Sequence, residues 1–163
     1  FQSSNREWEN TITAAEVLAP AGYDTAWFGK HHAVFNPTTR GFDKFGGFLG
    51  GAVNFWNPGT LTEDGKPVPG IRYDWIVDDK LVNPFIPEEG FHCTDAFTDW
   101  SLEWLKQEER ASAPWFLYLA YNAPHWPLHA HPEDIDKFRE TYKEGYVPTQ
   151  KARLENIEKL ETT

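Results

Sequence analysis

The chain has 163 residues, 40% hydrophobic and 16% aromatic, which excludes a disordered polypeptide and suffices for one domain with a buried core. Its formal net charge of −10 argues against a nucleic-acid partner, because phosphates are neutralised by clustered Lys and Arg that this sequence lacks. No run approaches the roughly 18 apolar residues of a membrane-spanning helix, so we expect no membrane partner.

The first predicted elements are a short helix and a strand. Thr13 and Glu16 form a capping-box pattern that begins the helix, and Gly22 is a suitable stop. Residues 23–28 are β-branched and aromatic enough to form a strand, which we expect Gly29 to close. The residues after this strand therefore stand at its carboxyl end.

Residues 33–93 read as an inserted lobe of loops and short strands. A glycine-rich run over 41–51 opens this lobe and predicts tight turns. Within it, Asp64-Gly65 predicts a hairpin turn between 61–63 and 66–68.

The second half predicts a helix, a buried strand and two further helices. Thr94 caps the first of these helices. Its apolar face comprises Phe97, Trp100, Ser101, Trp104 and Leu105. Residues 114–121 form a nearly unbroken apolar run, as expected of a strand covered on both faces in a parallel sheet. The last two helices begin at Pro132, ending near Gly145, and at Thr149.

Together these elements predict an α/β fold, with a mixed or parallel sheet, flanking helices and a loop-rich β insertion. The sequence contains no methionine, and its last helical pattern continues to the final residues. We therefore expect residues 1–163 to be the central part of a larger catalytic domain, truncated at both ends.

Basic side chains follow two of the predicted strands. Lys30, His31 and His32 come after the first strand, and His125 comes after the strand at 114–121. Ligands of parallel sheets bind beyond the carboxyl ends of the strands, so Lys30, His32 and His125 are expected to converge on one ligand. A lysine and two imidazoles suit an anion, although a solvated lysine and histidines that merely cap strand ends fit the spacing equally well.

Several motifs, in their order, resemble the sulfatase family of the alkaline-phosphatase-like superfamily. The helix and strand over 13–26, followed by Gly29-Lys30-His31-His32, are similar to the segment that leads into the family's Gly-Lys-Trp-His motif, with His31 in the tryptophan position. The segments 40–51, 94–99 and 116–127 are similar to later family signatures. The resemblance implies a partial alkaline-phosphatase-like sheet.

The resemblance also assigns roles to the basic residues. It implies that Lys30 and His125 contact the sulfate and that His32 supports the hydrated catalytic aldehyde, so these three are the predicted catalytic residues. Lys30, His125 and His31 are the predicted substrate-binding residues, although His31 departs from the motif and either reaches the leaving group or packs. The implied substrate is a small-molecule or glycan sulfate ester.

The family's nucleophile and metal ligands find no match in this sequence. The family oxidises the cysteine of a Cys-x-Pro-Ser-Arg motif to formylglycine, and Cys93 does not lie in such a motif. We expect formylglycine and a calcium ion in the full-length enzyme, both held outside this chain, and assign no metal ligand here. The isolated segment is predicted to be inactive.

Three other patterns in the sequence admit a functional and a structural interpretation. His129 and His131 have the alternating spacing of a zinc pair, but solvated loop histidines or contacts at the pocket mouth are favoured. Asp78-Asp79 reads better as a turn after a strand than as a metal-binding pair. Four aromatic residues form either a platform for a sugar ring or packing of the lobe; they are Phe55, Trp56, Tyr73 and Trp75.

Two other functions stay open at this point: a phosphoester or phosphonate ester hydrolase of the same superfamily, and a non-catalytic glycan-binding relative. Only the resemblance favours export to the periplasm, the exterior or the lysosome. The sequence predicts neither the oligomeric state nor the individual substrate.

Overall fold

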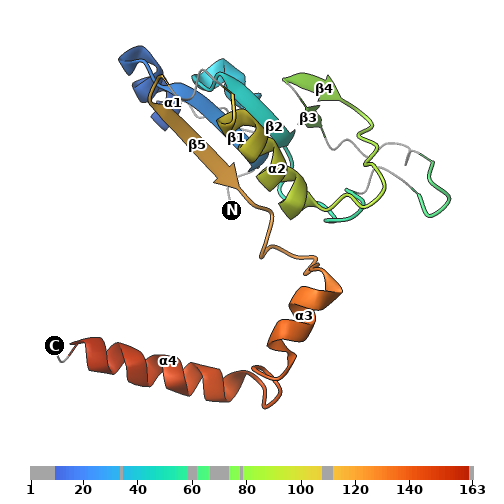
Figure 1. The fold of residues 1–163 in the computed structure, drawn as a ribbon, viewed down its shortest axis with the longest axis vertical. Coiled ribbons are helices and arrows are strands. Elements are labelled where there is room, and N and C mark those ends of the chain that lie inside the picture. Colours follow the sequence, from blue (N-terminus) through green and yellow to red (C-terminus); the bar gives the residue numbers. More distant parts are fainter. Residues whose placement is uncertain are drawn as a thin grey trace. The chain divides into compact units, whose positions relative to one another are not determined.

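A computed structural model shows the chain as two compact units, Phe1–His129 and Ala130–Thr163 (Figure 1). The residues that it describes are 10–33, 35–58, 62–66, 74–77, 79–107 and 112–161. Among these residues, no helix combines the length and apolar character that crossing a bilayer requires.

The first unit is built on a five-stranded sheet with the order β4-β3-β2-β1-β5. The strands are β1 (Asp24–Lys30), β2 (Lys44–Phe48), β3 (Trp75–Val77), β4 (Lys80–Val82) and β5 (Trp115–Ala120). β1 is parallel to both β2 and β5, while β3 is antiparallel to β2 and β4. The predicted α/β fold with a mixed sheet and flanking helices is confirmed.

Two helices of this unit match the sequence pattern closely. α1 (Ala14–Leu18) begins with the predicted capping box of Thr13 and Glu16, and the short helix η1 (Ala19–Ala21) extends it to Gly22, whose φ is +84°. α2 (Cys93–Leu105) buries Phe97, Ser101 and Trp104 of the predicted face.

The predicted cap of α2 at Thr94 was wrong by two residues, because His92 occupies the cap position without a capping side-chain bond. The N–H of Cys93 instead donates to the carbonyl of Phe55, 2.9 Å away. A loop carbonyl thus satisfies the start of the helix where a capping side chain was expected.

α1 and α2 cover opposite faces of the sheet, because successive side chains of a strand alternate between its faces. Ala26 and Phe28 of β1 cluster with Trp104 of α2. Trp27, between them in the sequence, clusters with Ala15 of α1. The unit therefore has three layers, with the sheet in the middle.

The glycine-rich run over 41–51 was expected to form tight turns, but its residues 44–48 form β2, which lies beside β1. Phe45 and Phe48 are fully buried there, and Gly46 makes room for the Phe28 ring, since an added Cβ would lie 3.0 Å from Phe28 Cδ1. The range 33–93 therefore supplies three strands to the main sheet. Whether the chain is the central part of a larger domain stays a prediction.

Two smaller features of this range agree with the sequence pattern. A turn is present at the predicted position, since the N–H of Thr62 donates to the Lys66 carbonyl at 2.7 Å, while most of the two flanking strands lies outside the described residues. Asp79 forms the turn between β3 and β4, where it pairs with Lys44 at 3.0 Å and accepts from the Phe45 N–H at 2.8 Å. Asp79 is therefore a structural acid, and Asp78 lies outside the described residues.

The second unit holds α3 (Pro132–Arg139) and α4 (Tyr146–Glu161). α3 ends before Gly145, where its end was predicted, and α4 begins three residues before the predicted start at Thr149. Lys137 and Arg139 bind acids one turn earlier on α3, which is the usual arrangement of an exposed charged helix.

Candidate active site

β1 and β5 end at the same edge of the sheet. They are parallel and in register from Asp24 opposite Trp115 to Gly29 opposite Ala120. Lys30 and Tyr121 therefore leave the sheet side by side. The prediction that the two basic turns share one rim is confirmed, and it is the geometry on which the candidate site depends.

Glycine allows the strands to approach closely at this rim. Gly29 has a φ of +116°, and a Cβ added to it would lie 2.0 Å from the carbonyl oxygen of Ala120. On the other side, a Cβ added to Gly47 would lie 1.9 Å from the carbonyl oxygen of Gly29. Gly29 was expected to close β1, but the strand continues through Lys30. Because Gly29 has no side chain, its backbone can pair with both Gly47 and Ala120 inside the strand.

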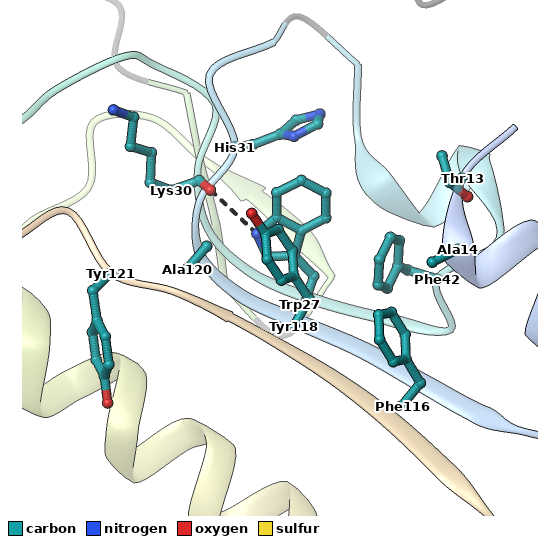
Figure 2. Close-up of a pocket in the computed structure, with 10 residues that line it drawn as sticks. All are labelled: Thr13, Ala14, Trp27, Lys30, His31, Phe42, Phe116, Tyr118, Ala120 and Tyr121. Carbon is teal, nitrogen blue, oxygen red and sulfur yellow. Dashed lines mark hydrogen bonds between the residues drawn. The ribbon is translucent and has the colours of Figure 1, made fainter. Parts of the chain in front are cut away.

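A pocket of about 520 Å³ opens on the α1 side of this rim (Figure 2). Its lining residues are Thr13, Ala14, Trp27, Lys30, His31, Phe42, Phe116, Tyr118, Ala120 and Tyr121. The rings of Trp27 and Tyr118 meet edge to face at 4.6 Å, and the Trp27 indole donates to the Lys30 carbonyl at 3.2 Å. The pocket is thus mainly aromatic, with its positive charge at Lys30.

Lys30 and His31 leave the strand in different directions (Figure 2). The Lys30 side chain points away from the aromatic rings, and partial burial lowers the pKa of its amine below the ordinary value. His31 packs edge to face against Trp27 at 4.5 Å and Phe35 at 4.6 Å.

Burial, together with the nearby charge of His32, lowers the pKa of His31 to about 4. His31 is therefore neutral near pH 7 and adds no positive charge to the pocket. Packing is observed for His31, and contact with a substrate stays a prediction.

His32 and His125 are both exposed at the rim. His32 has a φ of +63°. The N–H of His125 donates to the Asn122 carbonyl at 2.9 Å, and its Nδ1 lies 2.5 Å from the carbonyl oxygen of Trp126. A carbonyl oxygen only accepts, so Nδ1 of His125 carries a proton and Nε2 is the atom left for a ligand.

The pocket lining of the described residues includes Lys30 and His31 but not His32 or His125. The rim thus brings both turns to one edge, and the convergence of all three catalytic candidates on a single ligand stays a prediction.

The sequence pattern misjudged the aromatic residues of the pocket. Residues 114–121 were predicted to be covered on both faces, but Trp115 and Tyr118 are each about half exposed. Phe116 and Tyr118 line the pocket, on the α1 side of the sheet. Leu117 and Leu119 pack on the other side, against the cluster that contains Trp104 of α2. The apolar run hides this alternation, because tyrosine and tryptophan are compatible with either face.

Asn122 is a second residue that the pattern analysis missed. Its side chain is buried, and Nδ2 donates to the carbonyl of Val53 at 3.0 Å, which joins the turn after β5 to the loop after β2. An asparagine directly after an apolar strand is a usable signal, because a buried amide N–H requires an acceptor.

The other candidate residues are buried, contact neighbouring side chains or backbone, or lie outside the described part of the chain. Phe55 and Trp75 are fully buried, which excludes them from a platform for a sugar ring, and Tyr73 lies outside the described residues. Trp56 packs against His92 at 4.5 Å. His129 Nδ1 accepts a hydrogen bond from the Phe55 N–H at 3.4 Å within the first unit, while His131 belongs to the second.

Cys93 does not fit the role of the family nucleophile, and the basic side chains at the rim do not fit the role of calcium ligands. Burial raises the pKa of the Cys93 thiol to about 12. Ca²⁺ prefers carboxylate and carbonyl oxygens, whereas Lys30, His32 and His125 offer nitrogen atoms, so these three do not form a calcium site.

Comparison with known proteins gives a consistent result. Residues 3–158 match the family described as Sulfatase. An arylsulfatase of Klebsiella aerogenes is 30% identical over an alignment of 159 residues that covers 93% of this chain and 32% of that protein. An N-acetylgalactosamine-6-sulfatase of Canis lupus familiaris is 25% identical over 80% of this chain and 28% of its own length.

Solved structures agree. The crystal structure of Ps i-CgsB in complex with k-i-k-neocarrahexaose has a TM-score of 0.56 and 30% identity, over 77% of this chain and 29% of that chain. BT4656 in complex with D-glucosamine-2-N,6-O-disulfate has a TM-score of 0.59 over 86% of this chain and 24% of that chain; its 21% identity supports the fold alone. The chain spans about a third or less of the length of these relatives.

Proposed function

Because this chain belongs to the sulfatase family, we propose that it is a segment of a sulfuric ester hydrolase in which Lys30 and His125 bind the sulfate group of the substrate and His32 supports the catalytic aldehyde. The observation that carries this proposal is the parallel, in-register pairing of β1 with β5, since it brings both basic turns to one rim. A sulfate ester is an anion, and this acidic protein needs local positive charge to hold one.

The substrate class that we propose is a sulfated glycan or an aryl sulfate. Relatives named arylsulfatase and N-acetylgalactosamine-6-sulfatase support both classes. A structural neighbour with 30% identity binds k-i-k-neocarrahexaose, which favours a sugar. The aromatic pocket beside Lys30 suits the apolar face of such a ring.

His125 has a defined part in this proposal. Its Nδ1 proton is directed at the Trp126 carbonyl, so Nε2 is the atom that faces an incoming sulfate. A sulfate oxygen only accepts hydrogen bonds, so Nε2 must also be protonated to donate one. We therefore expect the Nε2–H of His125 to donate to a sulfate oxygen beside the positive charge of Lys30.

The catalytic aldehyde and the metal ion are expected from other parts of the enzyme. Cys93 is a poor substitute for the family nucleophile, because its thiol is buried and its pKa is raised to about 12. We accordingly propose that the isolated 163-residue chain does not turn over sulfate esters.

Kinetics of the full-length protein test this function. We expect hydrolysis of 4-nitrophenyl sulfate in preference to 4-nitrophenyl phosphate. Lys30→Ala and His125→Ala should each lower kcat/KM by about 10²–10³-fold, the usual effect of removing a group that stabilises transition-state charge. Lys80→Ala is the control, because it removes the same charge from an exposed position on β4.

Three outcomes would count against the proposal. Preferential hydrolysis of the phosphate ester would favour the related phosphoester hydrolases. Binding of sulfated sugars without turnover would favour a glycan-binding relative. Equal activity of the Lys30→Ala and Lys80→Ala variants would remove Lys30 from the site.

A further inference from the structure

The backbone of His32 adopts a conformation that side-chain-bearing residues rarely hold. Its φ is +63°, in the left-handed region, which costs a residue other than glycine about 1–2 kcal/mol. Such a conformation persists only where the surroundings fix it, and residues of this kind cluster at functional sites. The contacts of the His32 ring therefore indicate the role of this backbone conformation.

The His32 ring occupies the place where residue 51 would carry a side chain. A Cβ added to Gly51 would lie 2.6 Å from His32 Nε2, 2.9 Å from Cδ2 and 3.1 Å from Cε1. Gly51 is not among the glycines with positive φ, so its own backbone does not require glycine. The space taken by the imidazole accounts for a glycine at this position.

The loop that carries Gly51 is fixed before this residue. The N–H of His31 donates to the Phe48 carbonyl at 3.0 Å, which continues the β1–β2 pairing beyond the strands. The N–H of Leu49 donates to the Asp74 carbonyl, also at 3.0 Å. Gly51 therefore starts from a defined position at the end of β2.

The same loop is fixed after Gly51. The carbonyl of Val53 accepts the buried Asn122 amide at 3.0 Å, and the carbonyl of Phe55 accepts the N–H of Cys93 at 2.9 Å. Anchors on both sides keep the Gly51 backbone from withdrawing if a side chain is added. The exposed His32 ring is the partner that must move.

We infer that Gly51 is a positioning residue for His32, whose ring it admits against the loop backbone at the rim that carries Lys30. This inference rests on the proposed role of His32 in sulfate ester hydrolysis. A larger residue at position 51 would rotate the imidazole away, because the three atoms nearest to the added Cβ all belong to His32.

The test uses the full-length protein with Gly51→Ala. We expect kcat for 4-nitrophenyl sulfate to fall by about 10²-fold with little change in KM, because a misplacement of about 1 Å in a reacting group can have an effect of this size. In a His32→Ala background the added Cβ meets no ring, so Gly51→Ala should cause no further loss. Gly22→Ala is the control, since a Cβ there meets nothing within 4 Å.

A spectroscopic measurement separates this inference from the proposed function. In protein labelled with ¹⁵N-histidine, Gly51→Ala should shift the His32 ring signals and leave those of His125 unchanged. If the wild-type protein hydrolyses no sulfate ester, the proposed function fails, whereas the shift still supports the positioning role.

Unchanged kcat with unchanged His32 signals would overturn the inference, as would an equal loss in the His32→Ala background. If Gly51→Ala folds only when combined with His32→Ala, the steric relation is supported directly.

Discussion

The close contact between β1 and β5 predicts that Gly29→Ala is severely destabilising. Two effects combine at this residue. The φ of +116° is unfavourable for alanine, at a cost of about 1–3 kcal/mol, and the new Cβ meets backbone rather than a movable side chain, 2.0 Å from the oxygen of Ala120. Overpacking of this kind adds about 1–3 kcal/mol, for a sum of about 2–6 kcal/mol.

Gly22→Ala is the matched control. Its φ of +84° also disfavours alanine, but no heavy atom lies within 4 Å of the added Cβ. The control should therefore lose about 1–2 kcal/mol from the backbone alone. The difference between the two variants isolates the contact between β1 and β5.

Urea unfolding of both variants measures this difference. With a slope of about 1–3 kcal/mol per molar urea, Gly29→Ala should unfold at a midpoint lower than that of Gly22→Ala by on the order of 1 M. Equal midpoints would mean that β1 and β5 do not approach as closely as described. The argument that one rim carries both basic turns would then lose its main support.

Two further predictions concern buried titratable groups. Because the folded-state pKa of His31 is about 4, below its ordinary value of 6.5, the unfolded chain binds the extra proton first, and stability falls as the pH drops from about 6.5 to 4. His31→Phe keeps the packing and should remove on the order of 3 kcal/mol of this pH-dependent loss in the free energy of unfolding. Urea unfolding at several pH values measures the effect, and an unchanged pH dependence would refute a neutral buried His31. Cys93 should react with iodoacetamide at pH 8 at least about 10³-fold more slowly than a free cysteine until urea is added, and rapid labelling of the folded protein would contradict its burial.

The sequence pattern predicted those features of the fold that depend on local chemistry. The capping box of α1, the buried face of α2 and the parallel direction of β1 and β5 follow from hydrogen-bonding and apolar spacing along short segments. The shared rim followed from these, because parallel strands present their carboxyl ends together.

Features that depend on distant contacts were not predictable in this way. Glycines in 44–48 suggested turns, but their missing side chains allow β2 to lie against the neighbouring strand and the Phe28 ring. The start of α2 is set by the Phe55 carbonyl, and the position of the His32 ring by Gly51. In each case, the deciding atom lies at least 18 residues away in the sequence.

The anchoring of the loop by Asn122 has an evolutionary consequence. With Val53 held by the Asn122 amide and Phe55 by the start of α2, the path of the chain beside His32 is set before the turn at residues 63–66. Insertions and deletions in the exposed turn at residues 63–66, which comes after both anchors and before β3, can therefore accumulate without displacing the basic rim.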